Sequence, residues 1–150
     1  MAFCYTDPWG VRRHLGLPPF TTGEALHGVA SGCVAAGKVS HGTGCPSAFP
    51  AASALGASFS DELWHEVGAA ISSEARAFTN FGLSTNLVLF TPNINIVKDV
   101  RWGRSQEVPG EDPSLTARYV RAFAAGMQAV DVNETCCDQC TSPDKDCACW

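Results

Sequence analysis

The stretch LVLFTPNINIVKDVRWGRSQEVPGEDPSLTARYVRAFAAGMQ, residues 87–128, decides the fold. It opens with the continuous apolar run Leu87–Phe90, which is typical of a strand that is buried on both faces. Prolines and glycines recur through residues 91–112 and mark turns, so this part predicts a long structured loop. Asp112 then stands at an N-cap position and Pro113 at a first helical position, where its missing N–H is not needed. The stretch therefore predicts a strand, a long loop and a helix.

A second helix is predicted upstream, where Ser60 is a suitable N-cap and Gly82 a stop signal. Residues 47–59 before it predict another short strand with its loop. This alternation favours parallel βα units, in which functional groups gather on the loops that leave the carboxyl ends of the strands. The buried faces of the two helices are expected at helical spacing: Leu63, Val67, Ile71, Ala75 and Phe78 in the first, and Leu115, Tyr119, Phe123 and Met127 in the second.

Composition narrows the possible functions. A chain of 150 residues with 45% hydrophobic and 17% charged residues is expected to form one soluble globular domain. The net charge of -5 argues against a nucleic-acid partner, because phosphate binding needs clustered lysine and arginine. No apolar run approaches the roughly 20 residues of a membrane span, and residues 1–14 do not resemble a secretion signal.

Eight cysteines are unevenly distributed, and five of them follow residue 135. We therefore divide the chain into a domain of residues 1–130 and an irregular, cysteine-rich tail of residues 131–150. The tail thiolates at 137, 140, 147 and 149 can close a tetrahedral zinc site, form disulfides, or belong to an end without selected structure. Cys33 and Cys45 flank a glycine-rich loop and are either disulfide-bonded or free.

The loop of residues 91–112, called the charged loop below, suggests two interpretations. Arg101, Trp102 and Arg104 suit a polyhydroxylated ligand, because guanidinium groups bond hydroxyls and an aromatic face packs against a sugar ring. Alternatively, the arginines pair with Glu107, Glu111 and Asp112 to stiffen the loop, and the tryptophan is buried beneath it. Glu107 and Glu111 also suggest a carboxylate pair such as glycosidases use, although Glu111 equally suits the start of a helix.

The segment FTPNINIVKDVRWGRSQEVPGEDPSLTARYV, residues 90–120, resembles the N-terminal domain of glycoside hydrolase family 3, of the β-xylosidase and β-glucosidase type. The resemblance continues upstream through GLPPFTTGEALHGVA and FPAASALGASFSDELWHEVGAAISSEARAF, and covers roughly residues 15–128 in collinear order. It implies a partial TIM-type (β/α) barrel with parallel strands. It also implies hydrolysis of terminal, non-reducing β-linked sugars, as in xylan catabolism, without a metal or organic cofactor.

Residue by residue, the resemblance implies that Glu24 and Arg104 bind the hydroxyls of a sugar. An ionised acceptor and a planar donor would together orient a carbohydrate. Three residues are expected to support the loop instead: Arg101, Trp102 and Glu107. We expect His27 to be a packed, hydrogen-bonded histidine rather than a catalytic one.

The sequence also departs from the family pattern. Thr21, Thr22 and Gly23 stand where a tryptophan usually precedes the glutamate, so one aromatic wall of the pocket is expected to be missing. The nucleophilic aspartate, the acid/base residue and the sugar-gripping Lys-His pair of the family have no counterpart in the chain, and Asp138 and Gln139 stand near the place of that pair. We assign no catalytic residue and no metal ligand.

We therefore expect an incomplete barrel that is weakly active or inactive by itself and that can associate through its open edge. One alternative is a non-catalytic carbohydrate-binding or interaction protein, and another is a metal binder that uses the cysteine tail. The sequence leaves open the choice among xylose, glucose and arabinose. It leaves the compartment open as well, since complete relatives are often secreted.

Overall fold

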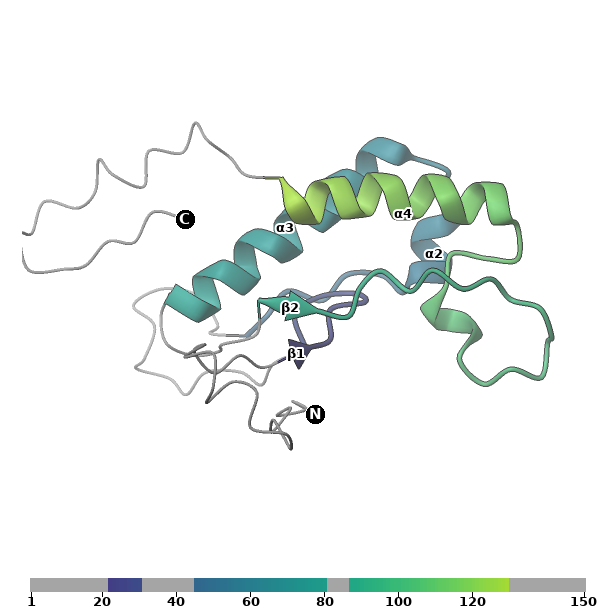
Figure 1. Ribbon diagram of the computed structural model, residues 1–150, viewed down its shortest axis with the longest axis horizontal. Helices are drawn as coiled ribbons and strands as arrows, with labels where there is room; N and C mark the ends of the chain where they lie inside the picture. Colours follow the sequence, from purple (N-terminus) through teal and green to yellow (C-terminus); the bar gives the residue numbers. More distant parts are fainter. Residues whose placement is uncertain (1–21, 31–44, 81–86, 130–150) are drawn as a thin grey trace, which may run out of the picture.

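A computed structural model describes residues 22–30, 45–80 and 87–129 (Figure 1). The elements in this part of the chain are β1 (Thr22–Gly23), α2 (Ala52–Gly56), α3 (Asp61–Asn80), β2 (Val88–Leu89), the short 3-10 helix η1 (Ser105–Glu107) and α4 (Pro113–Gln128). From residue 87 onward, the predicted order of elements, a strand, a long loop and a helix, is confirmed.

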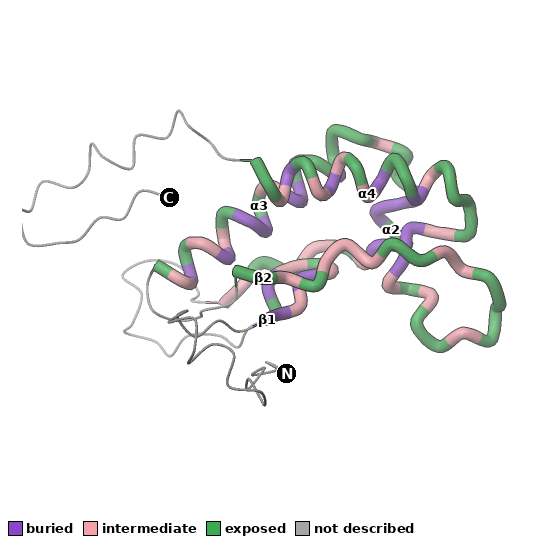
Figure 2. Tube along the Cα trace, viewed as in Figure 1, coloured by how far each residue is buried: buried purple, intermediate pink, exposed green. Residues whose placement is uncertain are grey.

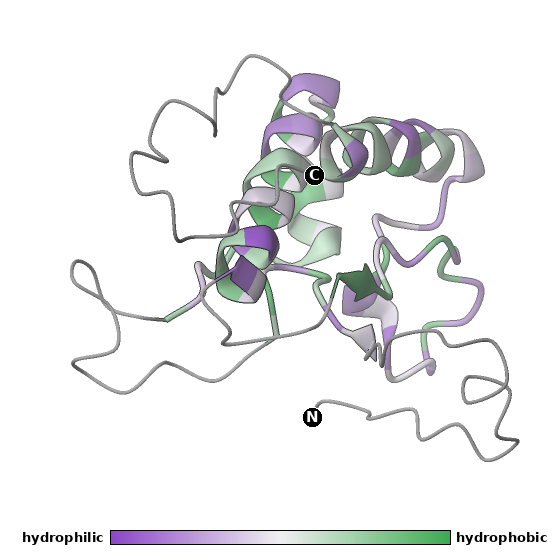
Figure 3. Ribbon diagram, turned by 60° about the vertical axis from the view of Figure 1, so that its left-hand side comes forward, coloured by the Kyte–Doolittle hydropathy of each residue, from purple (hydrophilic) through white to green (hydrophobic). Residues whose placement is uncertain are grey.

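The two strands form a small parallel sheet. Thr22 lies opposite Val88 and Gly23 opposite Leu89, and the Phe90 N–H extends the pairing by donating to the Gly23 carbonyl at 2.9 Å. Helices α3 and α4 lie on the same side of the strands (Figures 1 and 3). Parallel strands that alternate with helices confirm the predicted βα organisation.

Helices α3 and α4 pack against each other at two glycines. A Cβ atom at Gly68 would lie 2.4 Å from the Phe123 carbonyl oxygen, and one at Gly126 would lie 2.0 Å from the His65 carbonyl oxygen. Only glycine lets the two backbones approach so closely. Buried positions recur along both helices and in α2 (Figure 2).

Aromatic rings fill the space between these helices. The ring centroids of Trp64 and Tyr119 are 5.3 Å apart, and those of Tyr119 and Phe123 are 5.5 Å apart. All three residues are at most 1% exposed. Of the predicted buried faces, six positions are confirmed as buried: Val67, Ile71, Ala75, Phe78, Tyr119 and Phe123. Leu115 and Met127 are half-buried.

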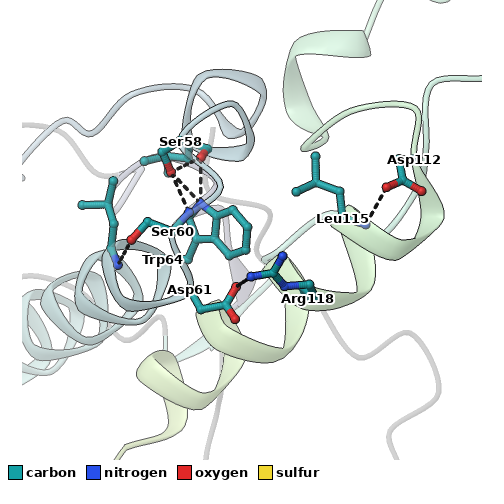
Figure 4. Close-up of polar contacts among 9 residues, drawn as sticks. Ser58, Ser60, Asp61, Trp64, Asp112, Leu115 and Arg118 are labelled. Carbon is teal, nitrogen blue, oxygen red and sulfur yellow. Dashed lines mark hydrogen bonds and ion pairs between the residues drawn. The ribbon is translucent and has the colours of Figure 1, made fainter.

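The prediction for Leu63 is wrong, because this residue is 38% exposed while its neighbour Trp64 is fully buried. Consecutive helical residues point about 100° apart, so Trp64 at the centre of the buried face turns Leu63 toward its margin. The indole Nε1–H of Trp64 donates to the Leu55 carbonyl at 2.7 Å and to the Ser58 hydroxyl at 3.1 Å (Figure 4). These bonds join α2 to α3 and settle which face of α3 is buried.

The short strand predicted in residues 47–59 is also wrong, because Ala52–Gly56 forms the helix α2. Alanine and leucine favour a helix over a strand, and one turn is enough to bury Leu55. Gly56 lies against the charged loop, since a Cβ there would be 2.3 Å from the Pro109 carbonyl oxygen.

Strand β2 is shorter and more exposed than predicted. Leu87, Val88 and Phe90 are 57%, 46% and 59% exposed, respectively, so the segment is not buried on both faces. Within the described residues, β1 is its only neighbour in the sheet, and the side of β2 that faces away from the helices has no covering layer there.

Both predicted helix starts are confirmed. The Ser60 hydroxyl accepts from the Leu63 N–H at 3.2 Å, and the Asp112 carboxylate accepts from the N–H groups of Ser114 and Leu115 at 3.0 and 3.2 Å. An ion pair of 3.0 Å between Arg118 and Asp61 joins the two helices near these starts (Figure 4).

Several predictions concern other parts of the chain. Gly82, Cys33 and the tail of residues 131–150 lie outside the described residues. Of the two alternatives for Cys45, disulfide-bonded or free, the structure shows the first, and the partner cysteine lies outside the described residues. Among the placed residues, no helix has the length and apolar character that crossing a membrane requires. Nor does this part of the chain bring together three histidine, cysteine or acidic residues that suit a metal ion.

Candidate functional site

Glu24 and Arg104 line the same surface clefts although they are far apart in the sequence. Glu24 directly follows β1, and Arg104 lies in the loop after β2, immediately before η1. A cleft of about 450 Å³ beyond the end of β2 is lined by Glu24, Leu26, Leu89, Phe90, Thr91, Pro92, Asn93, Ile94, Arg104 and Glu107. Because the strands are parallel, their following loops meet at one edge of the sheet.

Arg104 is held by Glu107 in a two-point ion pair. Its Nε–H donates to Oε1 of Glu107 at 2.8 Å, and one NH2 group donates to Oε2 at 2.5 Å. These bonds lower the pKa of the Glu107 carboxyl and raise that of the Arg104 guanidinium, to which the charge of Glu24 also contributes. Arg104 is therefore a cation that is held by Glu107 and that senses the charge of Glu24.

Glu107 has a second contact within the loop. Besides holding Arg104, its Oε2 accepts from the Asn93 side-chain amide at 3.5 Å, so Glu107 connects the start of the loop to its centre. The loop is closed at its base by a hydrogen bond of 3.0 Å from the Val97 N–H to the Gly110 carbonyl.

Arg101 pairs within the loop as well, but with Asp99 rather than with Glu107 or Glu111. Its Nε–H and NH2 group donate to the two Asp99 oxygens at 2.9 and 2.5 Å, and its side chain is 86% exposed. The hydrogen bond from Arg101 lowers the pKa of Asp99 to about 2. Arg101 does not line either cleft at Glu24.

Two expectations about packing are wrong. Trp102 is half-buried rather than core, and Val108, which is fully buried, fills the space under the loop. His27 is exposed and lines a second cleft of about 520 Å³, which shares Glu24, Arg104 and Glu107 with the first. In the segment after β1, Ala25 and Val29 are buried in the core while His27 between them is exposed.

Neither Glu107 nor Glu111 is placed in these clefts as a general acid. Glu111 is exposed and lines neither cleft, so the proposed pairing of Glu107 with Glu111 is wrong. Glu24 and Glu107 do line both clefts. However, both Glu107 oxygens accept from Arg104 and its pKa is lowered, which opposes the proton donation that a general acid must perform.

Sequence reasoning missed the outer wall of the second cleft, which is formed by residues 45–48. The Ser47 N–H and hydroxyl donate to the Glu74 carboxylate of α3 at 2.9 and 3.0 Å. Gly28, with φ of 128°, makes room for this wall, because a Cβ there would lie 2.2 Å from the Ser47 carbonyl oxygen. The only sequence signal was the glycine itself, since Glu74 looks like any charged residue on a helix surface.

Comparison with known proteins shows to which family the chain belongs. The model of the "Glycosyl hydrolase family 3 N terminal domain" matches residues 16–137. The chain is 40% identical to beta-D-xylosidase 3 of Arabidopsis thaliana over 97% of its own length, and 46% identical to exo-1,4-beta-xylosidase bxlB of Emericella nidulans over 78%. It spans 20% and 15% of the length of these two relatives.

Solved structures agree. A GH3 exo-beta-xylosidase (XlnD) in complex with a xylobiose aziridine probe superposes with a TM-score of 0.65 at 37% identity, covering 77% of this chain and 15% of that one. Beta-glucosidase 3B from Thermotoga neapolitana, in complex with glucose, gives a TM-score of 0.64 at 28% identity with the same coverage. The parallel strands, the helices beside them and the loop-borne Glu24 and Arg104 all lie within the matched residues, and this chain belongs to glycosyl hydrolase family 3, to whose N-terminal domain it corresponds in part.

Proposed function

We propose that this chain supplies one corner of the sugar pocket of a β-xylosidase-type glycoside hydrolase, in which Glu24 and Arg104 bind the hydroxyls of a terminal, non-reducing β-linked sugar. The observation that carries the proposal is the meeting of these two residues in one cleft beyond the ends of two paired parallel strands. We further propose that β1 and β2 are two strands of a TIM-type barrel, because the matched family domain, residues 16–137, includes both.

The two side chains suit a polyol chemically. The guanidinium group has five N–H donors, and Glu107 engages the Nε–H and one NH2 group, which leaves donors for a ligand. Glu24 is half-buried and supplies acceptors on the opposite side. A ligand that bonds both groups replaces water at two charged sites and thereby acquires a fixed orientation.

Hydrolysis requires more than this corner. A glycosidase needs two carboxyl groups at the scissile bond, one to attack or to activate water and one to protonate the leaving oxygen. The family resemblance places those groups in segments that have no counterpart here. We therefore expect the 150 residues, assayed by themselves, to bind a sugar with little or no turnover.

The test is a titration of the 150-residue chain with xylobiose and with glucose, together with an assay on an aryl β-xyloside. Replacing Arg104 with alanine, or Glu24 with glutamine, should weaken binding at least tenfold, because a charged hydrogen bond is lost. Arg101→Ala is the matched control and should bind like the parent. A parent chain that binds neither sugar would refute the site, and turnover that Arg104→Ala abolishes would refute the inactivity.

A second candidate function, association with another chain, is favoured by the exposed side of β2. Leu87 and Val88 are apolar and are 57% and 46% exposed, and open parallel strands readily pair with a further strand. Sedimentation velocity over a range of concentrations should then show self-association or complex formation that Val88→Lys abolishes. The control is Val100→Lys, at a residue that is 94% exposed and outside the strand. A chain that stays monomeric and binds no partner strand contradicts this candidate.

A further inference from the structure

Phe90 is a large apolar side chain that is 59% exposed and lines the cleft beside Glu24 and Arg104. Leaving so much aromatic surface in water costs stability. Within the cleft it supplies the aromatic surface, since the other apolar lining residues are Leu26, Leu89, Pro92 and Ile94.

The backbone fixes where this ring stands. The Phe90 N–H donates to the Gly23 carbonyl at 2.9 Å, so the residue continues the pairing of β2 with β1. Leu89, its neighbour, packs against the core between the sheet and the helices. Because side chains alternate along a strand, Phe90 points away from that core, and it lines the cleft while remaining exposed.

The two described residues that precede Glu24 offer no comparable surface. Thr22 is small and buried, and Gly23 has no side chain. A sugar held by Glu24 and Arg104 therefore meets aromatic surface from the neighbouring strand. This surface belongs to Phe90, whose N–H bonds the carbonyl of Gly23, the residue before Glu24.

We infer that Phe90 is the apolar platform of this site: its ring packs against the C–H face of a pyranose while Glu24 and Arg104 bond the hydroxyls. A pyranose ring exposes C–H groups on one face and hydroxyls around its rim, so a platform and two charged groups recognise complementary parts of it. This inference rests on the proposed function, and it adds the residue that selects ring-shaped polyols over flexible ones.

The experiment titrates xylobiose into the 150-residue chain, into three Phe90 variants and into one control variant. Phe90→Ala should weaken binding about tenfold, because the planar contact area is lost. Phe90→Leu keeps apolar bulk without a flat face and should weaken binding severalfold, with an unchanged helical circular dichroism signal. Phe90→Trp should retain binding, and its added indole fluorescence should change as the sugar binds. Val100→Trp, on an exposed residue outside the cleft, is the matched control and should give no change.

The outcomes separate the two proposals. If the parent binds, Arg104→Ala loses binding and Phe90→Ala does not, the platform is refuted while the proposed function stands. If the parent itself does not bind, the proposed function fails and the platform with it. A Phe90→Ala chain with unchanged affinity but altered sedimentation would assign the ring to association with another chain, which also overturns the inference.

Discussion

Replacing Gly126 with alanine should destabilise the pair of helices α3 and α4, although alanine is the better helix former. A Cβ at this position would lie 2.0 Å from the His65 carbonyl oxygen and 2.9 Å from the Ala69 nitrogen. Both are backbone atoms of α3, so no side chain can rotate out of the way. The helices must therefore move apart by more than 1 Å to reach the ordinary contact distance of 3.4 Å or more.

The magnitude follows from two opposing effects. Alanine gains about 1 kcal/mol over glycine inside a helix. Inserting one methyl group into a packed core costs about 1–3 kcal/mol, and a gap near 1 Å forfeits a quarter to a half of each van der Waals contact. The contacts at risk include the fully buried rings of Trp64, Tyr119 and Phe123. The cost therefore lies at the upper end, and the net loss of unfolding free energy is about 2 kcal/mol.

Urea unfolding followed by circular dichroism at the helical band measures this loss. With an ordinary slope for a small protein, the midpoint should fall by about 1 M. Gly103→Ala is the matched control, because a Cβ there meets nothing within 4 Å. It should be neutral or stabilise the chain by up to about 1 kcal/mol, through the unfolded state. A midpoint for Gly126→Ala equal to or above that of the parent would refute the close helix contact.

Three further substitutions test other parts of the structure. Trp64→Phe removes the donor to the Leu55 carbonyl and should lower the unfolding free energy in urea by about 2 kcal/mol. Trp102→Phe, at a half-buried position in the loop, should lower it by less than about 0.5 kcal/mol. Equal effects would contradict the deeper burial of Trp64. Asp112→Ala removes the N-cap of α4 and should cost about 1 kcal/mol, which an unchanged midpoint would disprove. Because Arg104 lowers the pKa of Glu107, their pairing is fully present above the ordinary carboxyl pKa of about 4.3 and is lost as the pH falls through the lower value. Sugar affinity should therefore fall on acidification in the parent and less so in Glu107→Gln, and identical pH profiles would show that the pair does not support the site.

The fold could be predicted where a local signal was strong. Asp112 followed by Pro113 marked the start of α4, and Ser60 that of α3, because capping depends on residues within one turn. The face of α3 was misjudged at Leu63, since the choice between it and Trp64 depends on a hydrogen bond to the distant Leu55. Helix α2 was missed because one turn carries too little periodicity to tell helix from strand.

The site was predictable only through the family resemblance. Sequence spacing alone could not predict that Glu24 and Arg104 line the same cleft, because their proximity depends on the parallel pairing of β1 with β2. The same limit explains the wrong pairing of Arg101, which bonds the nearby Asp99 rather than a carboxylate further along the loop. The role of Glu74 in fixing the cleft wall could not be seen either, since its partner Ser47 lies on a separate segment.

The backbone contacts around the cleft make sugar binding separable from hydrolysis. The strand end that leads to Glu24 is fixed by the bond between Gly23 and Phe90, and the wall at His27 is fixed by the bond of 2.8 Å from the Phe49 N–H to the His27 carbonyl. Arg104 is held by Glu107 within its own loop. Each of these contacts joins described residues to one another, so they hold the proposed sugar site in place by themselves. Pre-organised donors and acceptors lower the entropic cost of binding, whereas bond cleavage needs groups that act only in the transition state. An affinity for xylobiose without turnover is therefore the behaviour that this arrangement of residues should produce.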